Sequence, residues 1–168
     1  NIKIITGDSA LTTATIAGKI GLKGEMIEGG ELDKLTGKKW DEVVRTKTIF
    51  ARVTPQQKLK IVDTLREAGE VVAVTGDGVN DILALKRADI GVAMGMRGSD
   101  VARDSSDMVL LDDNFATIVK AIGIGRHIYN TLIRSAKFFL SCNGGEITAV
   151  FMAIMLRFPL PLLPLQIL

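Results

Sequence analysis

Two carboxylates and an amide lie close together in the segment Thr75–Asp81, whose sequence is TGDGVND. The apolar run 71–74 before it predicts a buried strand, and the residues that follow it predict a helix. Asp77, Asn80 and Asp81 would then lie at the carboxyl end of a parallel strand, where open α/β sheets bind ligands. Carboxylate oxygens suit Mg²⁺, which usually shares its coordination shell with phosphate. The segment therefore predicts a site for a hard cation and a phosphate group.

The elements that would position these residues alternate between strands and helices. The patterns predict strands at 2–5, 48–52, 71–74, 90–93 and 108–111, and helices at 9–20, 54–68 and 79–87. Thr54 followed by Pro55 is a helix cap with proline at the first helical position, and Gly21 and Gly69 end two of the helices. Residues 23–47 are polar and predict irregular structure with a short helix near 39–44. Alternation at this spacing predicts an α/β fold with a parallel, doubly wound sheet.

A long helical pattern begins at Asn114 and meets no proline before Pro159. Its second half, 138–156, has one acidic residue, and at about 1.5 Å per residue it nearly spans a hydrocarbon core of about 30 Å. Basic residues precede this half, which predicts a cytoplasmic location for its N-terminal side; they are Arg126, Arg134 and Lys137. Residues 158–164 predict a proline-rich turn, and 165–168 predict the start of a returning membrane segment. A buried helix of a soluble protein is the alternative for 138–156.

Composition argues against several classes of function. The 168 residues carry a net charge of +2 and only 5% aromatic residues, so no nucleic-acid-binding surface is expected. The single cysteine, Cys142, excludes an intrachain disulfide. The chain begins inside a predicted strand and ends inside an apolar run, from which we expect a piece of a longer protein.

Six stretches of the sequence match a known family. They are ITGD at 5–8, ARVTPQQK at 51–58, TGDGVND at 75–81, MVLLDDNFATIV at 108–119, GRHIYN at 125–130, and SCNGGE at 141–146 followed by PLPLLPLQIL at 159–168. Together they resemble the P-type ATPases, ion pumps that phosphorylate themselves on an aspartate. The last three stretches resemble calcium pumps of the sarcoplasmic-reticulum type and their bacterial relatives.

The resemblance implies a domain organisation. Residues 1–113 would be the C-terminal part of a phosphorylation domain with the haloacid-dehalogenase fold, a Rossmann-like sheet. Residues 114–137 would form a cytoplasmic stalk helix, 138–157 a transmembrane helix, and 158–168 an extracytoplasmic turn and the start of the next membrane helix. The protein would be integral to a membrane, with its phosphorylation domain in the cytoplasm.

The implied reaction is transfer of the ATP γ-phosphoryl group to an aspartate, followed by hydrolysis of the aspartyl phosphate. By resemblance, Thr6 and Gly7 would donate hydrogen bonds to the phosphoryl oxygens, and Lys58 would place a positive charge beside them. Asp8 and Arg52 would lie next to these groups and shape the nucleotide side of the site.

In the same way, Asp77 would ligate Mg²⁺, and Asn80 and Asp81 would complete the metal shell and orient the phosphate. The nucleophile is expected upstream, in a DKTGT motif. The similar stretch DKLTGK, which begins at Asp33, has an extra residue and follows ITGD, so it is interpreted as unrelated. Ile82-Leu83 replace the usual Ala-Pro after the motif, which changes the helix start and no ligand.

Asn143 and Glu146 are three residues apart and share one face of the long helix. A carboxylate inside a membrane is costly and usually marks an ion path, and amide and carboxylate oxygens are the ligands that Ca²⁺ takes. By resemblance, these two residues would form part of a calcium transport site. The alternative is that they hydrogen-bond neighbouring helices. Gly144 departs from the apolar residue common there, and His127 is expected to be a stalk residue without a ligand role.

Three functions remain open at the level of sequence. The first is part of a cation pump that uses ATP and Mg²⁺, contacts lipid, and works with an actuator domain, a nucleotide-binding domain and further membrane segments absent from this sequence. The second is a haloacid-dehalogenase-type phosphatase with a membrane tail. The third is a non-catalytic membrane module derived from a pump.

Overall fold

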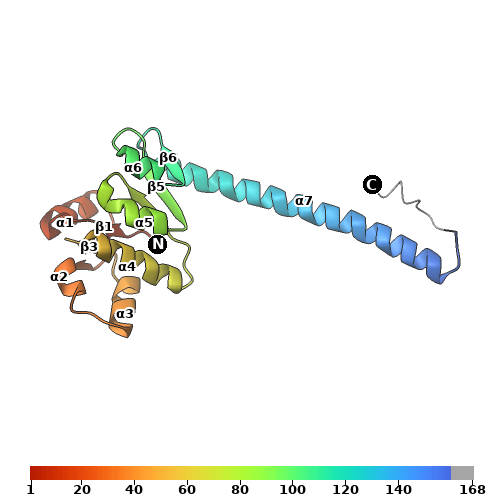
Figure 1. Ribbon diagram of the computed structural model, residues 1–168, viewed down its shortest axis with the longest axis horizontal. Helices are drawn as coiled ribbons and strands as arrows, with labels where there is room; N and C mark the ends of the chain where they lie inside the picture. Colours follow the sequence, from red (N-terminus) through yellow and green to blue (C-terminus); the bar gives the residue numbers. More distant parts are fainter. Residues whose placement is uncertain (160–168) are drawn as a thin grey trace. The chain divides into compact units, whose positions relative to one another are not determined.

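The structure is a computed structural model that describes residues 1–159. It divides into two compact units, the first at Asn1–Asn114 and the second beginning at Phe115. The first unit alternates strands and helices, and the second is dominated by one helix (Figure 1). The predicted α/β class is therefore confirmed.

The first half of unit 1 is a parallel three-stranded sheet of order β1-β3-β2. Its central strand β3 is buried along its whole length, which is usual for parallel sheets covered by helices. Phe50 of β3 is fully buried and pairs with Ile5 on one side and Ile27 on the other. The elements are β1 (Ile4–Ile5), α1 (Ala10–Lys19), β2 (Met26–Glu28), α2 (Gly29–Leu32), α3 (Lys38–Thr46), β3 (Ile49–Ala51) and α4 (Pro55–Glu67).

Trp40 of α3 closes the core of this half. Its indole Nε1 donates a hydrogen bond of 2.7 Å to Thr64 Oγ1 on α4, and both residues are buried. The Lys60 ammonium lies 3.8 Å from the centroid of the Trp40 ring, a cation–π contact. These contacts pack α3 and α4 against each other and anchor α4, the helix that carries Lys58.

The second half of unit 1 is another parallel sheet, of order β4-β5-β6. Its core joins Leu85, Ala93 and Ala102, with Val74 packed against them. The elements are β4 (Ala73–Gly76), the 3₁₀ turn η1 (Val79–Asp81), α5 (Ile82–Arg87), β5 (Ile90–Met94), α6 (Asp100–Asp104) and β6 (Met108–Leu110).

The parallel arrangement of the strands is as predicted, and the structure divides them between two sheets. The strands form two sheets, because β1 and β4 are edge strands and no strand within residues 1–159 pairs with their outer sides. The strand predicted at 71–74 begins instead at Ala73; Val71 is 83% exposed, so the strand is not the buried one expected. The strand β2 and the helix α6 were not predicted, since each is short and lacks a clear apolar period.

The start of α4 confirms the predicted cap. Thr54 Oγ1 accepts from Gln57 N–H at 3.2 Å, and Gln57 Oε1 accepts from Thr54 N–H at 2.9 Å, which is a capping box. The buried Gln57 amide also donates to Gly29 O at 2.9 Å and to Asp33 Oδ1 at 2.6 Å. One side chain thus fixes both the start of α4 and its distance from α2.

The second unit contains α7 (Phe115–Met155), a single helix of 41 residues, so the predicted continuous helix is confirmed. At about 1.5 Å per residue it is roughly 60 Å long, twice the thickness of a hydrocarbon core. By length and composition it could cross a membrane, and only 6% of its most apolar window is buried.

The helix α7 ends in a Schellman motif. Phe158 N–H donates to Ala153 O and Arg157 N–H to Ile154 O, with Arg157 in the left-handed region at φ 55°. The end of the predicted transmembrane segment therefore coincides with a defined helix stop. The turn and returning segment predicted at 158–168 lie mostly outside the described residues.

We predict that Gln57→Ala lowers the free energy of unfolding by about 1–3 kcal/mol, because it leaves buried polar groups without partners. Urea denaturation of the chain measures this loss. The matched control is Gln56→Ala, which removes an exposed glutamine from the same helical turn. Equal losses in the two variants would contradict the assigned role of Gln57.

Candidate functional site

The predicted site residues lie where parallel strands end. Thr6, Gly7 and Asp8 follow β1, Arg52 follows β3, and Asp77 follows β4. Parallel strands within a sheet end at the same edge, and ligands of open α/β sheets bind outside that edge. The sequence prediction that these segments occupy strand ends is confirmed.

The turn after β1 is tied to the end of β3. Thr6 Oγ1 donates to Asp8 Oδ2 at 3.0 Å and accepts from Asp8 N–H at 3.1 Å. Asp8 O accepts from Arg52 N–H at 2.9 Å, and Thr6 O accepts from Val53 N–H at 3.0 Å. No acceptor among residues 1–159 takes the N–H of the exposed Gly7, which leaves this donor available to an anion.

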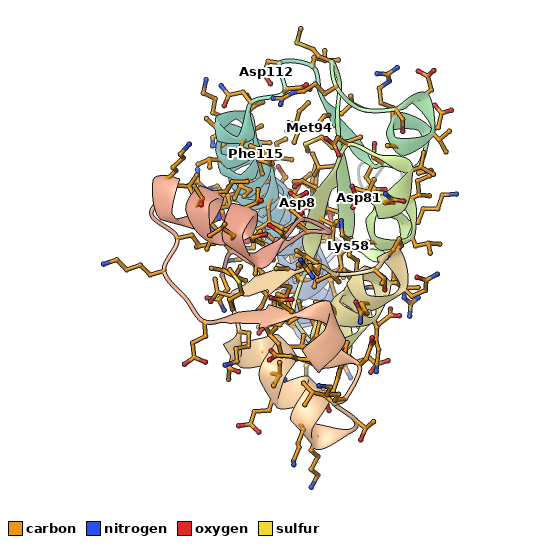
Figure 2. The ribbon with its side chains drawn as sticks, turned by 90° about the vertical axis from the view of Figure 1, so that its left-hand side faces the viewer. Asp8, Lys58, Asp81, Met94, Asp112 and Phe115 are labelled. Atoms are coloured by element: carbon orange, nitrogen blue, oxygen red, sulfur yellow. The ribbon has the colours of Figure 1, made fainter. Side chains whose placement is uncertain are left out.

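Lys58 and Asp81 form an ion pair that joins α4 to η1. Lys58 Nζ lies 2.6 Å from Asp81 Oδ1, and each side chain is only 15% exposed. Figure 2 shows both side chains in the middle of the unit, between elements of the two sheets. Partial burial strengthens this pair relative to an exposed one, because solvent screens it less.

Gly76 makes room for this pair. A Cβ atom at position 76 would lie 2.5 Å from Asp81 Cβ and 3.1 Å from Asp81 Oδ2. The glycine is therefore required by the close approach of Asp81, and its φ is not in the left-handed region. Packing against Asp81 is thus the reason for glycine at position 76.

The backbone of Asp77 is held by the loop 95–99, and its side chain has no partner among residues 1–159. Asp77 O accepts from Ser99 N–H at 2.9 Å. Its exposed carboxylate makes no hydrogen bond or ion pair within the described part of the chain. Asn80 is also exposed, so the polar groups of this turn face solvent at the strand end.

The carboxylate oxygens of this turn fit Mg²⁺ as ligands. They comprise the Asp77 carboxylate and the Asp81 oxygen that Lys58 does not bind, and Mg²⁺ needs only one or two carboxylates besides phosphate and water. Within residues 1–159 no group of three or more histidine, cysteine or acidic side chains gathers as a metal centre. The site therefore suits a metal that arrives with a phosphate.

Within unit 1, one predicted group is not brought to this turn. The Arg52 guanidinium is exposed and pairs with Glu28, with Nε 3.9 Å from Oε2. Asn143 and Glu146 lie in unit 2, on α7, where Asn143 is exposed and Glu146 is half-buried. Their assignment as cation ligands stays a prediction.

Residues 1–89 match a family described as haloacid dehalogenase-like hydrolases. The chain belongs to this family. A haloacid dehalogenase-like domain thus carries the three strand ends described above, and the expectation drawn from the resemblance is confirmed for the fold.

Curated relatives match the domain together with the long helix. The chain is 47% identical over 168 residues to calcium-transporting ATPase 1 of Bacillus cereus, covering 98% of this chain and 19% of the relative. It is 46% identical to the cation-transporting ATPase pma1 of Synechocystis and 43% identical to calcium-transporting ATPase type 2C member 1 of Homo sapiens, and covers 19% of each. The chain therefore spans about a fifth of the length of these relatives, and the predicted resemblance to cation-transporting ATPases is confirmed.

A solved structure of the catalytic domain of the CPx-ATPase CopB-B shares the fold. The TM-score is 0.54 at 24% identity, over 71% of this chain and 38% of that one. This likeness supports the architecture of the haloacid dehalogenase-like unit.

Sequence reasoning missed Ser99 and Gln57, which support the site without belonging to it. Ser99 binds the backbone of Asp77, and Gln57 fixes the start of the helix that carries Lys58. Ser99 precedes an acidic residue at the start of α6, and its hydroxyl oxygen accepts from Ala102 N–H at 3.2 Å, the pattern of a helix cap. This cap pattern could have revealed α6. The contact of Ser99 with Asp77 is long-range and has no signal in the sequence.

We predict that Gly76→Ala destabilises the chain by about 1–3 kcal/mol, because the added methyl group overpacks against Asp81. Thermal or urea denaturation measures the effect. Gly30→Ala is the matched control, since a Cβ there would meet nothing within 4 Å. A Gly76 variant as stable as the Gly30 variant would show that Asp81 moves away without cost.

Proposed function

We propose that the chain is part of an ATP-driven cation pump of the P type, in which unit 1 supplies half of the phosphorylation site and α7 crosses the membrane. The observation that carries this proposal is the Lys58–Asp81 pair, which holds the Lys58 ammonium group beside the Asp77 turn at the carboxyl ends of the strands. The names of the curated relatives support the same function.

The chemistry of unit 1 is positioning and charge neutralisation of a phosphoryl group. Lys58 supplies a positive charge whose place is fixed by Asp81, and the Gly7 N–H supplies a hydrogen bond to a phosphoryl oxygen. The Thr6 hydroxyl now donates to Asp8, and it can turn to the phosphoryl group. Asp8 and Asn80 are polar residues that follow the ends of β1 and β4, and Arg52 borders the nucleotide side.

The metal binds through Asp77 and Asp81 in this proposal. When bound, Mg²⁺ would neutralise charge on the phosphate oxygens of ATP. Asp81 then has two tasks, since one of its oxygens also orients Lys58. The Asp77 carboxylate is unengaged within the described residues and is the principal ligand.

The nucleophilic aspartate is proposed to lie on a further strand of the full-length protein, between β1 and β4. Both strands have an unpaired outer side among the described residues, and both end in site residues. Asp33 is unsuited to the role because Gln57 Nε2 holds its carboxylate at 2.6 Å in support of α4.

The cation path is proposed to include Asn143 and Glu146 of α7. Their oxygens are ligands of the type that Ca²⁺ takes, and the relatives named above include calcium-transporting ATPases. The basic residues before 138 favour a cytoplasmic location for unit 1 in an integral membrane protein.

In the full-length protein, we expect Asp77→Asn to reduce phosphoenzyme formation from ATP by at least about tenfold, because the metal loses its principal ligand. The measurement is acid-stable incorporation of γ-phosphate. Asp104→Asn, a change of an exposed carboxylate on α6, is the control and should keep normal levels. Normal incorporation in the Asp77 variant would refute its role as ligand.

We also expect Glu146→Gln to weaken the calcium dependence of ATP hydrolysis by at least about tenfold while nucleotide binding stays unchanged, because only the membrane site loses a charge. The control is Thr148→Ala, two residues further along α7 and on a different face. A calcium dependence equal to that of the control would assign Glu146 a structural role.

A further inference from the structure

The loop 95–99, which connects β5 to α6, is held by the carboxylate of Asp113. Asp113 Oδ1 accepts from Met96 N–H at 3.0 Å, and Oδ2 accepts from Arg97 N–H at 2.9 Å. The Asp113 side chain is only 6% exposed. Hydrogen bonds from backbone amides to a carboxylate are stronger than neutral ones, so this contact is a firm attachment.

The backbone at Asp113 is strained to make this contact. Its φ is 49°, in the left-handed region that a residue other than glycine rarely adopts. The Met96 N–H is the main cause that lowers the pKa of Asp113 from its ordinary value, with the Arg97 groups adding to it. The carboxylate therefore stays charged across the neutral range, and the attachment persists there.

The other side of the same loop is held by Arg103 of α6. Its Nη1 donates to Gly95 O at 2.7 Å and to Gly98 O at 2.9 Å. Carbonyl groups are thus bound on one side and amide groups on the other. Each of the five loop residues thus has a backbone group in a hydrogen bond, which restrains the loop on both sides.

The far end of the loop reaches the phosphorylation site. Ser99 N–H donates to Asp77 O at 2.9 Å, so the loop is bonded directly to the turn that carries the proposed Mg²⁺ ligand. The near end is bonded to Asp113, which precedes the first residue of α7, Phe115, by two positions. Hydrogen bonds therefore connect Asp77 to the Asp113 carboxylate through the five residues of the loop 95–99.

We propose that Asp113 is a positioning residue that links the Asp77 turn to the start of α7 through the loop 95–99. This inference rests on the proposed function, because it explains how a change at the phosphorylation site would reach the membrane helix. Asp113, the loop and the Asp77 turn all belong to this chain, so the link requires no additional ligand.

Asp107 provides a control with the same chemistry in a different place. Its Oδ2 accepts from Gly91 N–H at 2.8 Å, so it too binds a backbone amide of the second sheet. Gly91 lies near the beginning of β5, at the opposite end of that strand from the loop 95–99. Loss of the Asp107 contact should weaken the sheet without breaking the link to Asp77.

The choice of substitution follows from the backbone. Asp113→Gly removes both acceptor oxygens and accepts a positive φ without strain, whereas alanine would add strain at this position. Asp113→Asn keeps one acceptor oxygen and tolerates the left-handed region, so it should restore part of the link. The controls are Asp107→Gly and Asp107→Asn.

The first test is hydrogen exchange of the full-length protein, followed in peptides that cover 75–81. We expect Asp113→Gly to accelerate amide exchange there by at least threefold, Asp113→Asn to accelerate it less, and the Asp107 variants to leave it within twofold of the wild type. Exchange over 75–81 that is equally fast in Asp113→Gly and Asp107→Gly would overturn the proposal.

The second test measures Ca²⁺ uptake and ATP hydrolysis in sealed vesicles that contain the full-length protein. We expect Asp113→Gly to lower the Ca²⁺ moved per ATP by at least threefold while phosphoenzyme per folded protein stays within twofold. An unchanged ratio would overturn the link. A wild type that forms no phosphoenzyme would refute the proposed function instead, and the exchange experiment would still decide the link.

Discussion

The ion pair between Lys58 and Asp81 joins the two halves of unit 1 at the candidate site, while the Arg66–Asp89 and Arg87–Asp63 pairs join them elsewhere. The Lys58–Asp81 pair joins a helix of the first sheet to the turn that follows the edge strand of the second, and the two sheets share no strand hydrogen bonds. The position of each partner is set by residues close to it in the sequence. The Thr54–Gln57 capping box fixes the start of α4, so that Lys58 falls in its first turn, and Gly76 leaves space for Asp81. The Lys58 ammonium group and the Asp81 carboxylate are thereby held at the strand ends, where a phosphate and its metal would bind.

The features that the sequence predicts correctly are those with a local physical cause. The proline at the start of α4, the strand end before Asp77 and the uninterrupted apolar pattern of α7 each follow from a few neighbouring residues. The features it misses depend on distant partners. The strand β2 is defined by its pairing with β3, and the loop 95–99 by Asp113, so no window of sequence contains their cause. The Lys58–Asp81 pair is intermediate, because the family resemblance grouped the two residues and the structure supplied their direct contact.

The edges of the two sheets explain why the site is incomplete within the described residues. A parallel sheet is normally covered on both faces and paired on both sides of its central strands. Here β1 and β4 lead into the site residues and lie at edges, and several apolar side chains of unit 1 are exposed; these include Leu11, Ile20, Val71 and Val79. Since the chain covers 19% of its curated relatives, we expect further segments of the full-length protein to cover this surface. On the proposed function, such segments would complete the phosphate site.

The helix α7 imposes a different constraint, because its polar groups must be satisfied where a membrane would surround them. Thr148 meets it by donating to the carbonyl of Gly144, one turn earlier. Glu146 has no such contact among the described residues, and a carboxylate that lacks one is stable in a membrane only beside a cation, water or a polar partner. The glycines at 144 and 145 have no neighbour within 4 Å of where a Cβ would be, so they leave room for another helix at the same level. Glu146 makes insertion of an isolated α7 into a membrane costly in free energy, and a transported cation would stabilise its carboxylate. A neighbouring helix could pack at Gly144 and Gly145.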